Sequence, residues 1–131
     1  MKLEDKKLLL QDLCARLPYG VKMYTPLGVG HLCDINLNAV SIELGINIDA
    51  VKRDYFDIIN CKPYLRPMST MTEEEKKELN AIIVSKDDTL ISIVGTSEMF
   101  DYLNKKMFDY RGLIPRGCAI AVTEENNPYK D

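Results

Sequence analysis

The strongest constraint on the fold comes from a run in which apolar side chains occupy every second position. Val40, Ile42, Leu44, Ile46 and Ile48 alternate with polar residues or glycine. A period of two places all these apolar side chains on one face of an extended chain. The run therefore predicts a strand with one buried face and one solvated face.

Shorter extended segments precede this run and predict partner strands for it. Val21 and Met23 stand before the turn sequence TPLGVG, and residues from Val29 onward keep a less regular period of two. Short connections of this kind join antiparallel strands. Gly45 predicts a bulge or bend. We expect a small antiparallel meander over residues 20–67, with an SH3-like barrel as its curled form.

The segment that follows allows two interpretations. Residues 50–60 fit either one face of a helix or a short closing strand, and we favour an irregular loop that leads into a short strand or turn. The next residues, KPYLRP, contain two prolines, which lack an N–H and hold the preceding residue extended. We expect an edge of the sheet or an exit from it, with Leu65 and Met68 more buried than Arg66 and Ser69.

An N-terminal helix is predicted over residues 1–19. Leu10, Leu13, Cys14 and Leu17 recur at the spacing of one helical face, which we expect to be buried. A proline and a glycine directly after this stripe end the helix.

The C-terminal part, residues 68–123, combines further helices and strands. Thr72 and Glu75 have the spacing of a capping box, which predicts the start of a second helix. Residues 90–94 predict a short strand, TSEMFDYLNKKMFDYRG predicts a third helix and CAIAV predicts a last strand. The polar tail, residues 124–131, is expected to fray.

Together these segments predict a single α+β domain over residues 1–131. The antiparallel sheet is expected to pack against the N-terminal helix and to be followed by a helical part with one or two extra strands. The alternative is one continuous mixed sheet that helices cover on one face.

Composition limits the classes of function. Hydrophobic residues make up 46% of the chain and charged residues 28%, as in an ordinary globular domain. The net charge of −3 disfavours nonspecific nucleic-acid binding, which depends on lysine and arginine. No segment reaches the length of a membrane span, and the N-terminus lacks the features of a signal peptide. We therefore expect a cytoplasmic protein with no membrane association.

The cysteines and the single histidine offer little catalytic chemistry. Cys14, Cys33, Cys61 and Cys118 are far apart and form no C-x-x-C pair, so we expect free thiols and no metal site. Cys14 and Cys118 stand in apolar surroundings and are expected to be buried. Because no motif places partners around His31, we expect no catalytic residue and no cofactor.

Aromatic and basic residues form the candidate binding group. Tyrosine and arginine are enriched at binding hot spots, and both stack on single-stranded nucleic acid. The competing interpretation is structural, since half-buried tyrosines are common without any ligand. The candidates are Tyr64, Arg66, Tyr102, Tyr110 and Arg111.

Three stretches, LQDLCARLPYGVK, CKPYLRPMSTMTEEEKKEL and FDYRGLI, resemble a family of small uncharacterised proteins from Bacteroides-type gut bacteria and their phages or integrated elements. The resemblance covers about half of the chain and implies no known activity, ligand or catalytic residue. Such proteins often carry histidines directly before FDYRGLI, where this chain has Lys105, Lys106 and Met107.

Three hypotheses of function follow. The leading one is a non-catalytic protein-interaction or accessory module of a phage or mobile element, with a protein partner. The second is a nucleic-acid accessory factor that uses the tyrosine and arginine surface. The third is a small hydrolase-type enzyme without a recognisable motif.

Overall fold

The computed structural model describes residues 2–35, 39–45, 51–84 and 96–130, which form an α+β fold. The α-helices of this part are α1 (Leu3–Arg16), α2 (Glu73–Val84) and α3 (Thr96–Lys105). Its strands are β1 (Lys22–Thr25), β2 (Gly28–Ile35), β3 (Ala39–Gly45), β4 (Val51–Asp57), β5 (Lys62–Leu65) and β6 (Ile120–Ala121). Short 3-10 helices stand at Leu17–Tyr19, Ile58–Asn60 and Met68–Thr70.

The strands form one mixed sheet in the order β4-β3-β2-β1-β5-β6. Strands β1 to β4 make the expected antiparallel meander, and β5 returns to pair antiparallel with β1. Strand β6 then pairs parallel with β5, which makes the sheet mixed, as in the alternative arrangement. The described strands leave the sheet open, with β4 and β6 at its two ends, so the SH3-like barrel is not confirmed.

The paired strands settle two points of the meander. Residues 51–57 form β4 rather than the expected irregular loop, because they pair with β3 from end to end. The irregularity of the sheet lies in β2 between Leu32 and Asp34, whereas Gly45 pairs regularly with Val51. The predicted strand at residues 90–94 and the end of the alternating run lie outside the described residues.

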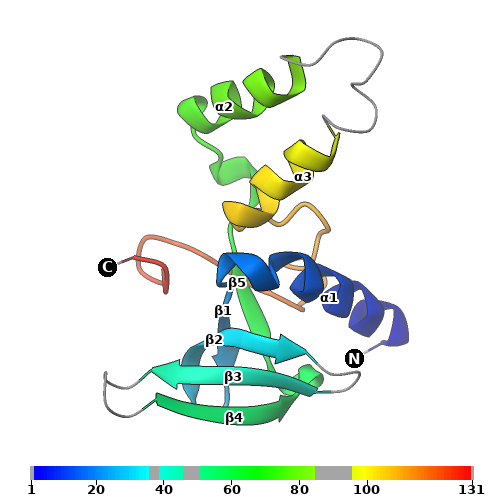
Figure 1. Ribbon diagram of the computed structural model, residues 1–131, viewed down its shortest axis with the longest axis vertical. Coiled ribbons are helices and arrows are strands. Elements are labelled where there is room, and N and C mark those ends of the chain that lie inside the picture. Colours follow the sequence, from blue (N-terminus) through cyan, green and yellow to red (C-terminus); the bar gives the residue numbers. More distant parts are fainter. Residues whose placement is uncertain (1, 36–38, 46–50, 85–95, 131) are drawn as a thin grey trace.

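Helix α1 lies across the sheet, while α2 and α3 stand beyond it, away from β2, β3 and β4 (Figure 1). The buried face of α1 is rotated from the face that the sequence predicts. Leu13 is buried as expected and Leu9 joins it, but Cys14 is exposed. The buried face continues into two charged residues, Asp12 and Arg16, instead of the predicted cysteine. The apolar spacing alone misses this rotation because it assigns no charged residue to a core.

The core combines α1 with β1, β5 and the chain that follows α3. Residues 107–119 form no helix or named strand, apart from a single β-bridge between Phe108 and Arg66, yet several of their side chains are buried. The carboxylate of Asp109 folds this segment, since its two oxygens accept hydrogen bonds from the backbone N–H groups of Leu113 and Ile114, at 2.9 Å each. The core members are Leu9, Leu13, Val21, Met23, Leu32, Ile58, Cys61, Leu65, Met107, Leu113, Cys118 and Ala119.

All four cysteines are free, as the sequence predicts. Cys118 is buried as expected, and Cys61 is buried as well. Burial, together with the negative charge of Asp57, raises the pKa of the Cys61 thiol to about 11. Because the thiolate is the reactive form, Cys61 is expected to be inert at neutral pH.

The KPYLRP stretch is extended, as its prolines predict, but it does not form an edge of the sheet. Pro63 pairs with Met23 of β1, whereas the next residue, Tyr64, pairs with Ile120 of β6. The first half of β5 therefore pairs with β1 and the second half with β6. A proline is tolerated in this interior strand because Pro63 itself pairs on one side only. Leu65 is fully buried as predicted, but Met68 is 42% exposed because the chain leaves the sheet in a 3-10 turn.

The predicted capping box is present at the start of α2. The hydroxyl of Thr72 accepts a hydrogen bond from the N–H of Glu75 at 3.1 Å, and the Glu75 carboxylate accepts one from the N–H of Thr72 at 3.0 Å. The two residues thus satisfy backbone donors that a helix start leaves without an intrahelical partner.

Thr72→Ala is expected to lower the free energy of unfolding by about 1 kcal/mol, the usual effect of losing an N-cap side chain. Chemical denaturation of both proteins measures the difference. The exposed Ser69→Ala, three residues earlier, serves as the control and is expected to change stability much less. Equal stability of Thr72→Ala and the parent protein would contradict the prediction.

The C-terminal tail is anchored rather than frayed. The hydroxyl of Tyr129 donates a hydrogen bond to the backbone oxygen of Tyr64 at 2.7 Å and accepts one from the N–H of Lys22 at 3.0 Å. Burial raises the pKa of this hydroxyl above its ordinary value. One aromatic side chain in a polar segment therefore ties the tail to β1 and β5.

Candidate functional site

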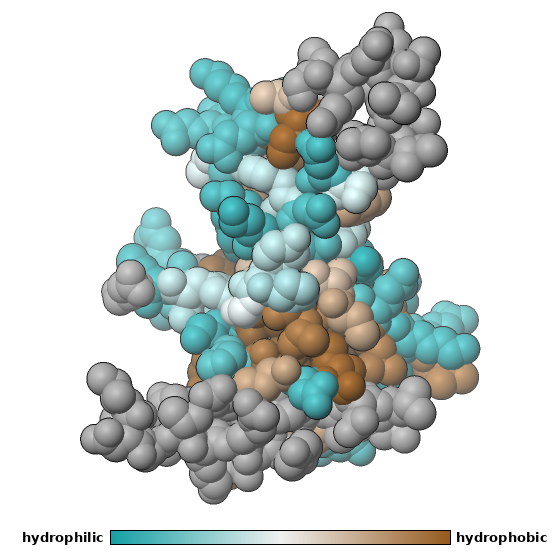
Figure 2. Space-filling view, in the orientation of Figure 1, coloured by the Kyte–Doolittle hydropathy of each residue, from teal (hydrophilic) through white to brown (hydrophobic). Residues whose placement is uncertain are grey.

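The tail and the end of α3 border an open groove with a mixed polar and apolar lining. It consists of two adjoining hollows of about 460 Å³ each, which share Arg66, Val122 and Asn127. Figure 2 shows hydrophilic surface on α2 and on the side of the tail, in contrast to hydrophobic surface over α1. The first hollow is further lined by Tyr19, Lys105, Lys106, Met107 and Tyr129. The second is further lined by Thr70, Thr123, Glu124 and Lys130.

The C-terminal end of α3 positions the two lysines of the first hollow. Met107 has a φ of 63°, a left-handed conformation that usually belongs to glycine. The N–H of Phe108 bonds to the oxygen of Leu103 at 2.9 Å, and the N–H of Met107 bonds to the oxygen of Asn104 at 3.1 Å. This pattern is a Schellman motif, which ends the helix sharply. Lys105 and Lys106 therefore lie at the negative end of the helix dipole.

Arg66 forms the common wall of both hollows, but its charge is already matched. Its two terminal nitrogens donate to separate oxygens of the Glu75 carboxylate at 2.7 Å each. Its guanidinium also lies 4.2 Å from the ring centroid of Phe108. Hydrogen bonds from Arg66 lower the pKa of Glu75 to about 2. Arg66 consequently forms part of the groove wall but contributes little unpaired positive charge.

The opposite wall belongs to the tail, which Tyr129 holds in place. Asn127 accepts a hydrogen bond from the N–H of Tyr129 at 3.0 Å, which turns the chain back toward the sheet. Since the Tyr129 hydroxyl is occupied by β1 and β5, its ring is the part left for the hollow. Tyr19, 36% exposed, adds a second aromatic ring.

The unmatched charge of the groove lies in the first hollow. Lys105 and Lys106 line it, and no acidic residue is among its described lining residues. The ammonium group of Lys106 lies 5.9 Å from the ring centroid of Tyr102, which favours one position of that side chain. The second hollow is lined by one acidic residue, Glu124, as well as by Lys130, so its lining is less positive.

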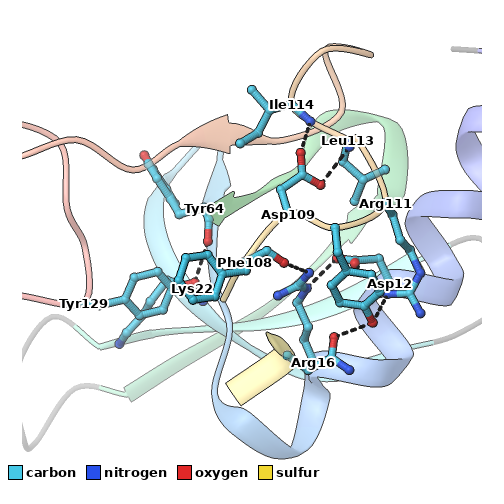
Figure 3. A network of polar contacts seen from close by, with 12 residues as sticks. Asp12, Arg16, Lys22, Tyr64, Phe108, Asp109, Arg111, Leu113, Ile114 and Tyr129 are labelled. Atoms are coloured by element: carbon cyan, nitrogen blue, oxygen red, sulfur yellow. Dashed lines mark hydrogen bonds and ion pairs between the residues drawn. The ribbon is translucent and has the colours of Figure 1, made fainter. Parts of the chain in front are cut away.

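A second polar cluster lies inside the protein and joins α1 to the segment after α3 (Figure 3). Asp12 accepts from Nε of Arg16 at 2.8 Å and from a terminal nitrogen of Arg111 at 2.9 Å. Asp12 and Arg16 are both fully buried, and Arg16 also donates to the backbone oxygen of Phe108. Arg111 donates to the hydroxyl of Tyr110 at 2.7 Å. These contacts hold α1 against the segment after α3, so we assign the cluster a structural role.

The five sequence-predicted binding residues do not form one surface. Tyr64 is buried and Arg66 lines the groove, but Tyr110 and Arg111 belong to the internal cluster. The Tyr102 hydroxyl donates to Glu78 of α2 at 2.7 Å, and burial, followed by this contact, raises its pKa. Their role in binding stays a prediction.

Sequence reasoning missed the tail residues of the groove. The signal was Tyr129, a large aromatic side chain within an otherwise polar tail, which indicates an anchor rather than a frayed end. Lys105 and Lys106 stand in the sequence just before FDYRGLI, but their place at a helix end next to the tail depends on tertiary contacts.

Metal ligands and the single histidine were the other candidates for chemistry in the sequence. Among them, no three histidine, cysteine or acidic side chains lie close enough together to hold a metal ion. His31 lies on β2 and lines neither hollow of the groove. In the same part of the chain, no helix has the length and apolar character needed to cross a membrane.

Comparison with known proteins gives no relative: no family model, no curated protein and no solved structure matches this chain.

Proposed function

We propose that this chain is a non-catalytic protein-interaction module and that its binding site is the groove between α3 and the tail. The observation that supports this function is the pair of lysines, Lys105 and Lys106, on an open hollow with no acidic residue among its described lining residues. Both walls are anchored by hydrogen bonds, so the groove exists before a partner binds. Preformed sites bind with a smaller loss of conformational entropy.

An accessory role inside the cell fits the same features. The resemblance to proteins of phages and integrated elements supports an accessory function, and four free thiols favour a reducing compartment. A nucleic-acid accessory role receives support from the lysines and the tyrosine rings of the groove. It is the second candidate, because the chain carries a net charge of −3 and phosphate binding requires positive charge.

A displayed library of random peptides tests the proposed function. We expect the parent protein to enrich a family of related peptides, and Lys105→Gln/Lys106→Gln to lose these peptides. The matched control is Lys76→Gln/Lys77→Gln, which changes an adjacent exposed pair on α2 and is expected to retain them. Circular dichroism melts establish that all three proteins are folded.

The proposal is wrong if the enriched peptides bind the Lys105/Lys106 variant as tightly as the parent protein, or if selection enriches nothing. The first result would place the site elsewhere, and the second would remove the support for a peptide-binding module.

A further inference from the structure

We infer that the occupant of the groove is a short acidic segment of a partner protein, with its carboxylates at Lys105 and Lys106 and an apolar side chain beside them. This inference rests on the proposed function and names the chemistry of its ligand. It draws on four properties of the groove: where its charge lies, how far that charge extends, which rings border it and how much space it offers.

The positive charge is local and suits only a few carboxylates. Arg66 is matched by Glu75, so Lys105 and Lys106 are the cations that remain for a ligand in the first hollow. Charge-assisted hydrogen bonds from lysine to carboxylate are stronger than neutral ones. Two adjacent acidic residues on a peptide therefore complement this end of the groove.

The charge along the groove disfavours a long polyanion. Glu124 lies in the second hollow, and Glu125 follows it in the tail. A nucleic-acid strand long enough to cross both hollows would meet these acids, whereas an acidic peptide confines its charge to the two lysines. This difference favours a protein segment over nucleic acid.

The aromatic rings provide the apolar part of the site. Tyr19 lines the first hollow and is 36% exposed, and Tyr129 lines it with a hydroxyl already bonded to the sheet. Tyrosine is enriched at the centres of protein interfaces because it buries a large rigid ring at a small entropy cost. We therefore expect an apolar ligand side chain next to the carboxylates, in contact with Tyr19.

The available space agrees with a short segment. Each hollow has a volume of about 460 Å³, within the range of sites that hold a small ligand. Two joined hollows thus accommodate a few consecutive side chains and not a folded domain.

Fluorescence anisotropy with a labelled peptide tests the inference on the full chain. The probe is a Gly/Ser decapeptide with a central Leu-Glu-Glu, and its matched control carries Leu-Gln-Gln. We expect the acidic peptide to bind the parent protein about tenfold more tightly than its amide control. Affinity should fall as salt rises, since exposed charges are screened.

Three protein variants locate the contact. Lys105→Gln/Lys106→Gln is expected to weaken binding of the acidic peptide about tenfold, to the level of the amide control. Tyr19→Ala is expected to weaken binding of both peptides severalfold, because the ring contacts the leucine. Lys76→Gln/Lys77→Gln should bind like the parent protein.

Two results would overturn the inference while leaving the proposed function intact. One is equal binding of the acidic and amide peptides. The other is selection of non-acidic peptides from the library, with binding that still depends on Lys105 and Lys106. Tighter binding of a labelled oligothymidine than of the acidic peptide would instead establish the nucleic-acid alternative. Failure of every peptide, selected or designed, would overturn both proposals.

Discussion

Asp12→Ala is expected to lower the free energy of unfolding by about 3–5 kcal/mol, the range for removing one partner of a buried ion pair. Asp12 and Arg16 are both fully buried, so the substitution leaves an arginine without its counter-ion in the core. One terminal nitrogen of Arg16, Nη1, already has no hydrogen-bond partner within the described structure. Arg111 loses its contact with α1 as well. Urea denaturation followed by circular dichroism measures the loss.

Asp5→Ala is the matched control on the same helix. Asp5 also pairs with an arginine, at 2.8 Å, but its partner Arg116 is 48% exposed. Exposed pairs contribute little because water screens them, so this variant is expected to lose only a small fraction of the stability that Asp12→Ala loses. Similar losses for both variants would show that burial does not set the strength of the Asp12 contacts.

A further variant separates pairing from packing. Asp12→Ala/Arg16→Met removes both charges and keeps a long apolar side chain at position 16. Replacing a buried ion pair with apolar residues is often neutral or stabilising. We expect the double variant to be more stable than Asp12→Ala alone, which would identify the unpaired arginine as the cause of the large loss.

Glu75→Gln is expected to destabilise the protein at pH 7 by about 1–2 kcal/mol, after allowance for solvent screening. Hydrogen bonds from Arg66 hold the pKa of Glu75 near 2, below its ordinary value of 4.5. A lowered pKa contributes stability that is fully present above pH 4.5 and is lost as the pH falls toward 2. The variant should therefore show a shallower decline of stability across this acidic window.

Glu74→Gln is the control for Glu75→Gln. It removes a carboxylate from the same helical turn, at a residue that is exposed to solvent. Thermal melts of both variants between pH 2 and pH 7 give the comparison, since the remaining carboxylates titrate alike in each. Parallel pH profiles for Glu75→Gln and the parent protein would contradict the assigned role of the Arg66 contact.

The two predictions concern two joints of the fold, of which only the second, through Arg66, borders the groove. Asp12 ties α1 to the segment after α3, and Glu75 ties the start of α2 to the residue after β5. Arg66 then contacts the end of α3 through a backbone bond from its N–H to the oxygen of Met107, at 2.7 Å. The KPYLRP stretch accordingly has a structural role as the exit from the sheet, and Arg66 links it to both helices.

Local patterns in the sequence were sufficient for several elements. The capping box of Thr72 and Glu75 predicted the start of α2, and the alternating run predicted the strand that became β3. The prolines of KPYLRP predicted its extended course. These signals work because backbone sterics, capping bonds and side-chain periodicity depend on residues within a few positions of one another.

Tertiary structure alone decided the groove and the buried cluster. Asp12 meets Arg111 from 99 positions away in the chain, and Tyr129 reaches Tyr64 across 65 positions. No local pattern marks Asp12 as buried, because a carboxylate enters a core only where distant cations and donors compensate for its lost hydration. The same reason explains the tail: its polar composition predicted fraying, and one hydroxyl between two strands anchored it.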